Sequence, residues 1–337
     1  MTSEKWSNEK ANAWYSQKPW LKGFNYVPSN AVNSTEMWQD ETFVPAIIHR
    51  ELKIASEIGF NSCRVFLQYI VWKDNPQGFI SRLEEFLQIA AANNLTVMPV
   101  FFDDCNFAGK EPYLGKQDEP RHGVSNSQWT PCPGPTLALD PAEMPMLKEY
   151  LQSIMHRYAS DKRILLWDMY NEPGNLEAKG SSLPLLEASF KWSREIDPSQ
   201  PLTCAVWLLP YDSECDAVCL EESDIISFHD YNTYDITAKA ITGLAVHGRP
   251  ILCTEWLNRP GNNRIETHIP LFKANNVGIF NWGLINGRTQ TNLAGYTIHG
   301  EPDPNPAEWQ HDFFHGDYTP YSADEIAYMK DIFVNGK

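Results

Sequence analysis

The sequence predicts a single (β/α)8 barrel. Short runs of β-branched or aromatic residues alternate with longer segments of helical period, and eight such pairs follow one another along the 337 residues. The strand-like runs are almost continuously apolar, as expected of parallel strands buried on both faces. Because parallel strands need crossover connections, eight strand–helix units are expected to close into a barrel. We therefore expect one domain over residues 1–337, with the barrel proper from about 20 to 335. Judged by its length alone, the chain could also form two domains.

The first four units can be traced in order. The first strand is expected at 23–27, and its helix near 43–59 carries the apolar stripe Ile47, Ile48, Leu52, Ala55 and Ile58. The second unit pairs a strand at 62–67 with a helix at 79–93. A strand at 96–102 is followed by a long loop rich in Pro and Gly over 103–139. Asp140-Pro141 is a good N-cap and first turn for a helix that reaches Tyr158. The fourth strand is expected at 164–170, with a helix at 183–196.

The remaining units follow the same alternation. The expected strands are 202–207, 224–228, 250–255 and 278–282. A short acidic connection with room for one helical turn follows the strand at 202–207. A helix near 235–247 follows the strand at 224–228, and a helix near 264–275 follows the strand at 250–255. A long loop follows the eighth strand. The last helix is expected at 322–334, because Ser322 and Glu325 have the spacing of a capping box.

Charge and composition exclude several classes of function. The chain has 43 Asp and Glu against 27 Lys and Arg, a net charge of −16, so neither nucleic acid nor an anionic membrane surface is an expected partner. The polar N-terminus does not resemble a signal peptide, which predicts a cytoplasmic protein, or a secreted or periplasmic one whose leader was removed. The seven cysteines suit free thiols. Cys215 and Cys219 form the closest pair, and no second pair at zinc spacing follows, so neither a metal nor another cofactor is expected.

Two glutamates stand where apolar strands stop. Glu172 follows the fourth strand in Trp167-Asp168-Met169-Tyr170-Asn171-Glu172-Pro173, and Glu255 ends the seventh in Ile251-Leu252-Cys253-Thr254-Glu255. Barrels carry their chemistry at the carboxyl ends of their strands. Two carboxyl groups that face each other across a pocket suit cleavage of a glycosidic bond, one as acid and the other as anion. Aromatic residues make up 12% of the chain, including 12 Trp, and some could stack on sugar rings.

These residues resemble clan A of the retaining glycoside hydrolases and are most similar to family five, which contains cellulases and mannanases. The resemblance covers all eight strands. It implies that Glu172 is the acid/base, Glu255 the nucleophile and Asn171 a partner of the sugar 2-hydroxyl. The other residues that match the family in order are Arg64 at the end of strand two, His229 and Tyr231 after strand six, and Trp282 at the end of strand eight.

The residues themselves suggest how some of these side chains act. A cation near Glu255 would lower the pKa of that carboxyl, and Arg64 could supply it. His229 and Tyr231 are two residues apart, so in extended chain both point to one side, toward the glutamates.

Several further residues are candidate substrate contacts. Asp103, in the loop after strand three, could bind sugar hydroxyls, as could His122 further along that loop, and Trp256 directly follows Glu255. Weaker candidates at strand ends and in loops are Glu36, Trp38, Asp104, Trp129, Trp207, His299, Trp309 and His311.

The function expected from the sequence is that of a retaining β-glycoside hydrolase. It would cleave β-linked glucan, mannan or related oligosaccharides by double displacement. The long loops after strands three and eight favour an exo-acting enzyme. Alternatives are a secreted endo-β-1,4-glucanase or mannanase, a transglycosidase, and a carbohydrate-binding barrel without catalysis. A metal-dependent hydrolase is disfavoured, because no His-x-His stands at a strand end.

Overall fold

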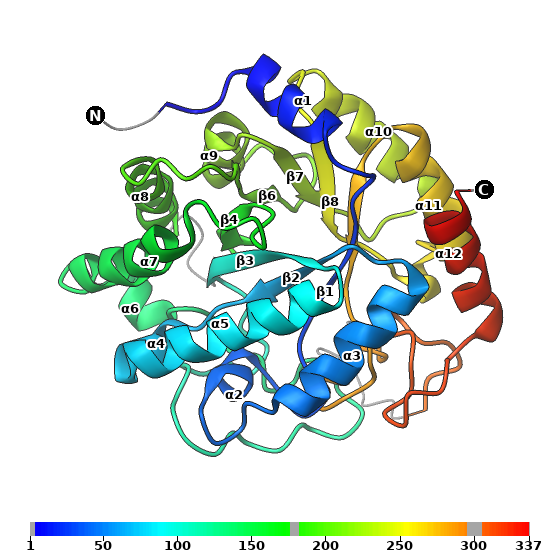
Figure 1. The fold of residues 1–337 in the computed structure, drawn as a ribbon, viewed down its shortest axis with the longest axis horizontal. Helices are drawn as coiled ribbons and strands as arrows, with labels where there is room; N and C mark the ends of the chain where they lie inside the picture. The colour runs from blue at the N-terminus through cyan, green and yellow to red at the C-terminus, as the bar shows by residue number, and fades with distance from the viewer. Residues whose placement is uncertain (1–3, 176–181, 295–304, 337) are drawn as a thin grey trace.

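A computed structural model describes residues 4–175, 182–294 and 305–336 of the chain. Within these ranges nine parallel strands form one sheet in the order β5-β4-β3-β2-β1-β9-β8-β7-β6, and helices surround it (Figure 1). The strands are β1 Lys22–Asn25, β2 Ser62–Phe66, β3 Thr96–Asp103, β4 Trp167–Asn171, β5 Leu202–Thr203, β6 Ala205–Val206, β7 Ile226–His229, β8 Ile251–Glu255 and β9 Gly278–Asn281.

The two ends of the sheet are two halves of one barrel strand. Only Cys204 separates β5 from β6; β5 pairs with β4, and β6 pairs with β7. The fifth predicted strand therefore joins both neighbours, and the eight-stranded barrel predicted from the sequence is confirmed.

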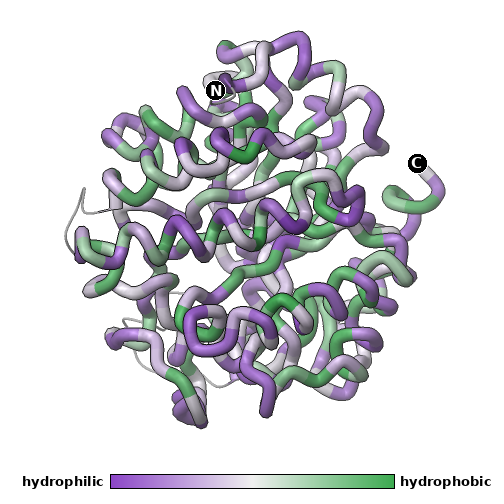
Figure 2. Tube along the Cα trace, turned by 60° about the vertical axis from the view of Figure 1, so that its left-hand side comes forward, coloured by the Kyte–Doolittle hydropathy of each residue, from purple (hydrophilic) through white to green (hydrophobic). Residues whose placement is uncertain are grey.

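Most of the barrel helices lie where the sequence predicts them, and each buries one face. The alternation of hydrophilic and hydrophobic residues along the outer helices is visible in Figure 2. The helices are α1 Asn8–Ser16, α2 Ser34–Trp38, α3 Pro45–Ile58, α4 Tyr69–Asp74, α5 Pro76–Ala92, α6 Pro135–Leu139, α7 Met144–Tyr158, α8 Leu183–Arg194, α9 Glu214–Glu222, α10 Tyr234–Ala245, η1 Arg259–Gly261, α11 Ile265–Ala274 and α12 Ala323–Asn335.

Two predicted helices differ from those observed. Helix α7 begins at Met144 and not at 141, because a helix running from 141 would place Pro145 where it lacks the N–H for the carbonyl of residue 141. Asp140 instead accepts the N–H of Ala142 in the preceding turn, at 2.9 Å. The acidic connection after β6 forms the nine-residue helix α9 rather than one turn, because Ser213 and Asp216 cap it reciprocally.

The last helix shows half of its predicted capping box. Ser322 accepts the N–H of Glu325 at 3.2 Å, as expected. The Glu325 carboxylate does not return to the cap, since it binds Arg259 of η1 at 2.9 and 2.8 Å. The capping residue was therefore predicted correctly, whereas the long-range partner of Glu325 was not.

The amino-terminal end of the barrel is filled by a separate apolar cluster. Helix α1, at the top of Figure 1, contributes Ala11 and Tyr15 to it, and the barrel contributes mainly residues at the starts of strands, with the Phe280 ring among them. This arrangement closes one end of the barrel and leaves the opposite end, where the strands finish, for polar side chains.

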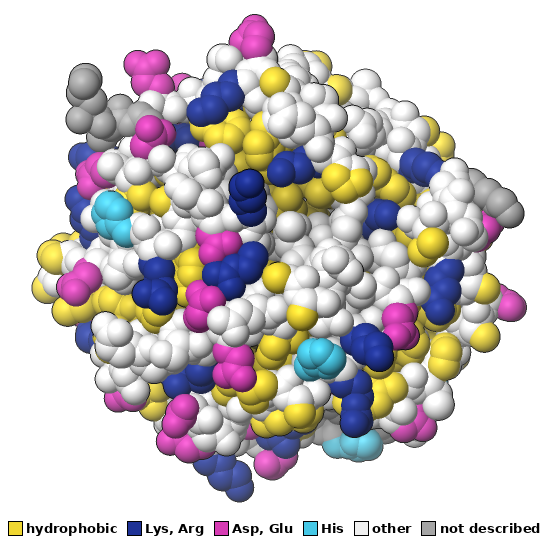
Figure 3. Space-filling model, viewed as in Figure 1, with side chains coloured by type: hydrophobic (Ala, Val, Ile, Leu, Met, Phe, Trp, Pro, Cys, Tyr) yellow, Lys and Arg dark blue, Asp and Glu magenta, His cyan; other side chains and the backbone are white. Residues whose placement is uncertain are grey.

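The surface shows no extended basic area on the face drawn in Figure 3, where Lys and Arg side chains are interspersed with Asp and Glu among the described residues. Within those residues no helix combines the length and the apolar character needed to cross a bilayer.

Close packing inside the barrel yields a test of the fold. A Cβ added to Gly23 would stand 2.2 Å from the Phe280 ring, so we expect Gly23→Ala to lower the free energy of unfolding by about 1–3 kcal/mol. Gly243→Ala is the matched control, because nothing lies within 4 Å of its Cβ position on α10, and helix propensity predicts a gain of about 0.5–1 kcal/mol. Urea denaturation measures both; equal stabilities would contradict this packing.

Candidate active site

The ends of three strands bring two glutamates and a histidine together. Glu255 ends β8, His229 ends β7, and Glu172 directly follows β4 with a left-handed φ of 47°. The pairing register of β7 against β8 shifts by one residue between Phe228 and His229. The register shift and the unusual φ both occur where the chain turns toward the site, as is common beside functional residues.

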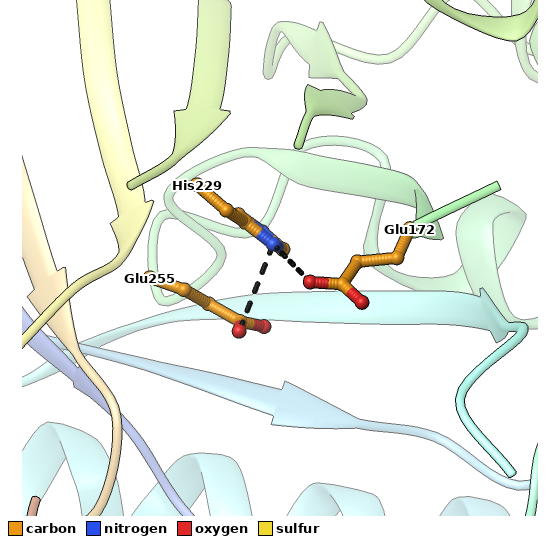
Figure 4. Close-up of side chains that lie close together, drawn as sticks. All are labelled: Glu172, His229 and Glu255. Atoms are coloured by element: carbon orange, nitrogen blue, oxygen red, sulfur yellow. Dashed lines mark hydrogen bonds and ion pairs between the residues drawn. The ribbon is translucent and has the colours of Figure 1, made fainter. Parts of the chain in front are cut away.

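The ring of His229 lies between the two carboxyl groups (Figure 4). Its Nδ1 is 2.9 Å from Glu172 Oε1 and 3.6 Å from Glu255 Oε2. One oxygen of each glutamate and a ring nitrogen all lie within 4.8 Å of one another. The two acidic side chains, 83 positions apart in the sequence (255 minus 172), therefore converge on one point at the mouth of the barrel.

Arg64 holds this end of the barrel together from below. Its buried guanidinium donates to four acceptors, at distances of 2.8 to 2.9 Å, and they come from β1, β4 and β8: Asn25 Oδ1, Asp168 Oδ2, Asn171 Oδ1 and Glu255 Oε1. Because the guanidinium is planar with donors in fixed directions, it sets the orientation of the side chains around it.

The two glutamates have different partners. Glu255 accepts Arg64 Nη1 and the hydroxyl of Tyr231, both at 2.8 Å, whereas Glu172 accepts Asn175 Nδ2 at 2.8 Å and the thiol of Cys105 at 3.2 Å. Glu255 thus faces a full positive charge at contact distance, and Glu172 faces neutral donors. A cation at contact distance favours the charged form of Glu255 more strongly than neutral donors favour that of Glu172.

Burial works against both negative charges. It raises the pKa of Glu255, with the Arg64 cation opposing the shift. Burial likewise raises the pKa of Glu172. The sequence predicted that Arg64 would lower the pKa of Glu255. Arg64 does act in that direction, but desolvation outweighs the cation, so the pKa of Glu255 is raised overall and the prediction is wrong for the net shift. Burial lowers the pKa of His229 to about 4, so this imidazole is neutral near pH 7.

A cavity of about 150 Å³ opens above the two glutamates. Of the predicted site residues it contains Glu172, Glu255, Asn171, Tyr231 and Trp282. Trp282 makes T-shaped contacts with Phe66 and Trp129, with ring centroids 5.6 and 5.9 Å away. The full lining is Cys105, Phe107, Ser125, Asn126, Trp129, Asn171, Glu172, Tyr231, Glu255, Trp282, Gln310 and His311.

Three predicted substrate contacts lie away from the cavity lining. Asp103 is buried beneath it, and Trp129 Nε1, Asn171 Nδ2 and the N–H of Cys105 occupy both of its oxygens. Trp256 packs outward against His268 and Phe272 of α11, which makes it a core residue. His122 is exposed in the loop after β3. The sequence identifies a strand end but not the side to which each residue there points.

The weaker candidates divide in the same way. Trp129 and His311 line the cavity. Asp104 is buried and accepts Tyr170 and the N–H of Gly174. Trp38 is a core residue, Glu36 accepts the N–H of Val32, Trp207 donates to the Pro173 carbonyl, and Trp309 stacks on Tyr321. His299 lies outside the described residues.

In the described part of the chain, sequence reasoning missed four side chains that hydrogen-bond to the side chains of Arg64 or Glu172. Asn25 and Asp168 bind Arg64, and Cys105 and Asn175 bind Glu172. Asn25 and Asp168 are polar residues inside otherwise apolar strands, a signal that could have identified them. Cys105 had no such signal, because it lies in a loop 67 positions before Glu172.

Three long loops interlock at one side of the mouth. Gln290, after β9, donates to the carbonyls of Arg121 and Val124 at 2.7 and 3.1 Å, and the N–H of Asn126 donates to Thr289 at 2.7 Å. The loop after β1 joins them where Asn33 donates to Gln117 and Gln128. Ser125 and Asn126 line the cavity beside these contacts, so the joined loops form one of its walls.

A cation could find ligands only at the same three residues among the described part of the chain, namely Glu172, His229 and Glu255. Two of them already bond to each other, and the Arg64 guanidinium touches the third. The guanidinium charge beside Glu255 would repel a divalent cation bound to these three residues.

Comparison with known proteins places the fold. No family model and no curated protein sequence matches the chain. Three similar solved structures are exo-β-1,4-mannosidase Op5Man5 from Opitutaceae bacterium strain TAV5, GH5_18 from Streptomyces cattleya in complex with Manβ1-4GlcNAc, and β-glucosidase 1317 without ligand. Their TM-scores are 0.66, 0.64 and 0.61, their identities are 13%, 15% and 10%, and each match covers 94% of this chain.

The matches cover 59%, 80% and 98% of those three chains, so this chain spans less than two thirds of the mannosidase. The fold is therefore the (β/α)8 barrel found in family 5 glycoside hydrolases.

The network around Arg64 generates a second prediction. Arg64→Met would leave Asp168 and Glu255 buried without their cation, so we expect stability at pH 7 to fall by about 3–5 kcal/mol. The deficit should shrink as the pH falls, because a protonated carboxyl costs less to bury. Chemical denaturation at pH 7 and pH 5 tests this against exposed Arg157→Met, expected within about 0.5 kcal/mol of the parent. A deficit independent of pH would contradict the electrostatic account.

Proposed function

We propose that the protein is a retaining β-glycosidase with Glu255 as nucleophile and Glu172 as acid/base. The observation that carries this proposal is the pair of carboxyl oxygens within 4.8 Å of each other at the cavity, with a charged partner on one side chain and neutral partners on the other. Retaining enzymes hold the two groups about 5–5.5 Å apart, whereas inverting enzymes leave about 6.5–9.5 Å for a water molecule.

The unequal partners assign the two roles. Glu255, held by Arg64 and Tyr231, attacks the anomeric carbon as the anion. Glu172 gives its proton to the departing oxygen. Formation of the glycosyl ester removes the negative charge of Glu255, which lowers the pKa of Glu172, so Glu172 can then take a proton from the attacking water.

The supporting residues have matching roles. Neutral His229 bonds to Glu172 without competing for its charge, and Trp282 forms the floor beneath the sugar. Asn171 reaches the cavity with its amide orientation fixed by Arg64 and Asp103, which suits a hydrogen bond to the sugar 2-hydroxyl.

The substrate we propose is the terminal sugar of a β-linked gluco- or manno-oligosaccharide, removed in the exo mode. The interlocked loops support this, because they raise a wall beside the cavity where a longer chain would have to pass. The solved structures named above, a β-1,4-mannosidase, a complex with Manβ1-4GlcNAc and a β-glucosidase, suggest these sugars and linkages. The wall argues against an endo-glucanase or mannanase, and the intact pair of glutamates argues against an inactive binding barrel.

Catalysis by the pair is tested with nitrophenyl β-glycosides. We expect Glu255→Ala to lower kcat about 10⁴-fold or more, because the nucleophile is lost. Glu172→Ala should lose about 10²–10⁴-fold, and added azide should restore turnover as a β-glycosyl azide, since an activated leaving group needs no acid.

Nuclear magnetic resonance of the first sugar released should show the β-anomer. Asp103→Asn, beneath the cavity, is a control expected to retain the nucleophile and the anomeric outcome. Wild-type rates in both alanine variants would refute the assignment, and sugar binding by a parent protein without turnover would support the inactive barrel.

The wall is tested with a ladder of β-1,4-linked oligosaccharides. Gln290→Ala removes the contacts to Gly123, Arg121 and Val124, so we expect a several-fold rise in kcat/KM on long substrates relative to disaccharides. Gln88→Ala, on the exposed side of α5, is the matched control and should leave the ratio unchanged. Internal cleavage of long substrates by the parent protein would show that the exo assignment is wrong.

A further inference from the structure

Cys105 stands out among the seven cysteines. All seven are free and buried, but Cys105 alone belongs to the cavity lining in the described part of the chain. Its Sγ lies 3.2 Å from Glu172 Oε2, a short distance for a sulfur hydrogen bond. The thiol therefore touches the side chain that we propose as the acid/base.

The direction of this hydrogen bond follows from the neighbouring amides. Asn171 Nδ2 and Asn175 Nδ2 lie 3.4 and 3.5 Å from Cys105 Sγ and can only donate to it. The orientation of the Asn171 amide is fixed, because its oxygen accepts from Arg64 and its nitrogen also donates to Asp103. The sulfur thus accepts from two sides, and its hydrogen points to the carboxyl of Glu172.

The backbone around Cys105 is built to keep this contact. Asp103 accepts the N–H of Cys105 at 2.9 Å, which forms a tight turn directly after β3. The same carboxyl binds Trp129 at 2.7 Å, so the turn is anchored to a wall of the cavity. Asp103, expected from the sequence to bind substrate, thereby directs the thiol instead.

The two oxygens of Glu172 consequently have different surroundings. Oε2 accepts from both Cys105 and Asn175, whereas among the described residues Oε1 meets only Nδ1 of His229. An oxygen that already accepts two donors is a poor place for a proton. The proton of the acid form then belongs on Oε1, the oxygen on the side of His229 and Glu255.

We propose that Cys105 is a positioning residue for Glu172, whose thiol directs the transferable proton to Oε1 and determines how firmly the side chain holds it. This inference rests on the proposed function of Glu172. A donor to the carboxylate favours its charged form, so losing the thiol should make Glu172 a weaker acid that remains protonated to higher pH.

The pH dependence of kcat/KM on a β-1,4-linked disaccharide, whose departing sugar needs an acid, tests the proposal. Its basic limb reports loss of the Glu172 proton in the free enzyme. We expect Cys105→Ala to move this limb upward by about one pH unit, the size typical of a hydrogen bond to a charged group. Cys105→Ser keeps a donor and should return the limb toward the parent value, while Cys63→Ala, a buried cysteine on β2 outside the cavity lining, should leave it unchanged.

Asn175→Ala keeps the test decisive if Cys105→Ala folds poorly, because Asn175 is exposed and donates to the same oxygen. It should move the basic limb in the same direction. The basic limb of Cys105→Ser should then lie at a pH nearer the parent value than the basic limb of Asn175→Ala. A basic limb that stays in place in Cys105→Ala, or that moves equally in the alanine and serine variants, would overturn the role of the thiol. Absence of glycosidase activity in the parent protein would instead refute the proposed function.

Discussion

The candidate site depends on one buried cation. Arg64 projects from β2 into a barrel whose other end is filled with apolar side chains, and it satisfies acceptors from three other strands at once. A guanidinium this deeply buried needs carboxylates beside it, and carboxylates this deeply buried need a cation. The positions of Asp168, Asn171 and Glu255 are therefore coupled to one another through the same guanidinium.

The chemistry we propose depends on a difference between two carboxyl groups in one small volume. Burial affects both in the same way, and their separate partners distinguish them: a charged guanidinium and a phenol on Glu255, a thiol and an amide on Glu172. A neutral imidazole between them links their positions without adding charge. The same barrel can support many reactions, so this asymmetry, more than the fold, is the argument for glycoside chemistry.

The sequence predicted the units of the fold better than it predicted their ends. Strands and amphipathic helices were identified because apolar periodicity is a local property, and the split of the fifth strand at Cys204 does not disturb it. The start of α7 and the extent of α9 depended on Pro145 and on the Ser213–Asp216 cap, which are local but easily misread. Helix α1 was missed because its burial comes from covering the barrel end, a contact with residues far along the chain.

For the site, the order of residues along the chain was sufficient to nominate Glu172, Glu255, Arg64, Asn171, His229, Tyr231 and Trp282. All but one stand at or just after the carboxyl end of a strand, and these ends meet in a closed barrel. Arg64, which was expected at the end of strand two, is instead the middle residue of β2. Whether a side chain at such an end enters the cavity depends on backbone rotation and on its neighbours. That is why Trp256 became a core residue, Asp103 a support for the Cys105 turn, and His122 an exposed loop residue. The contact between Cys105 and Glu172, like the interlocking of three loops, joins segments distant in sequence, and only tertiary packing could decide it.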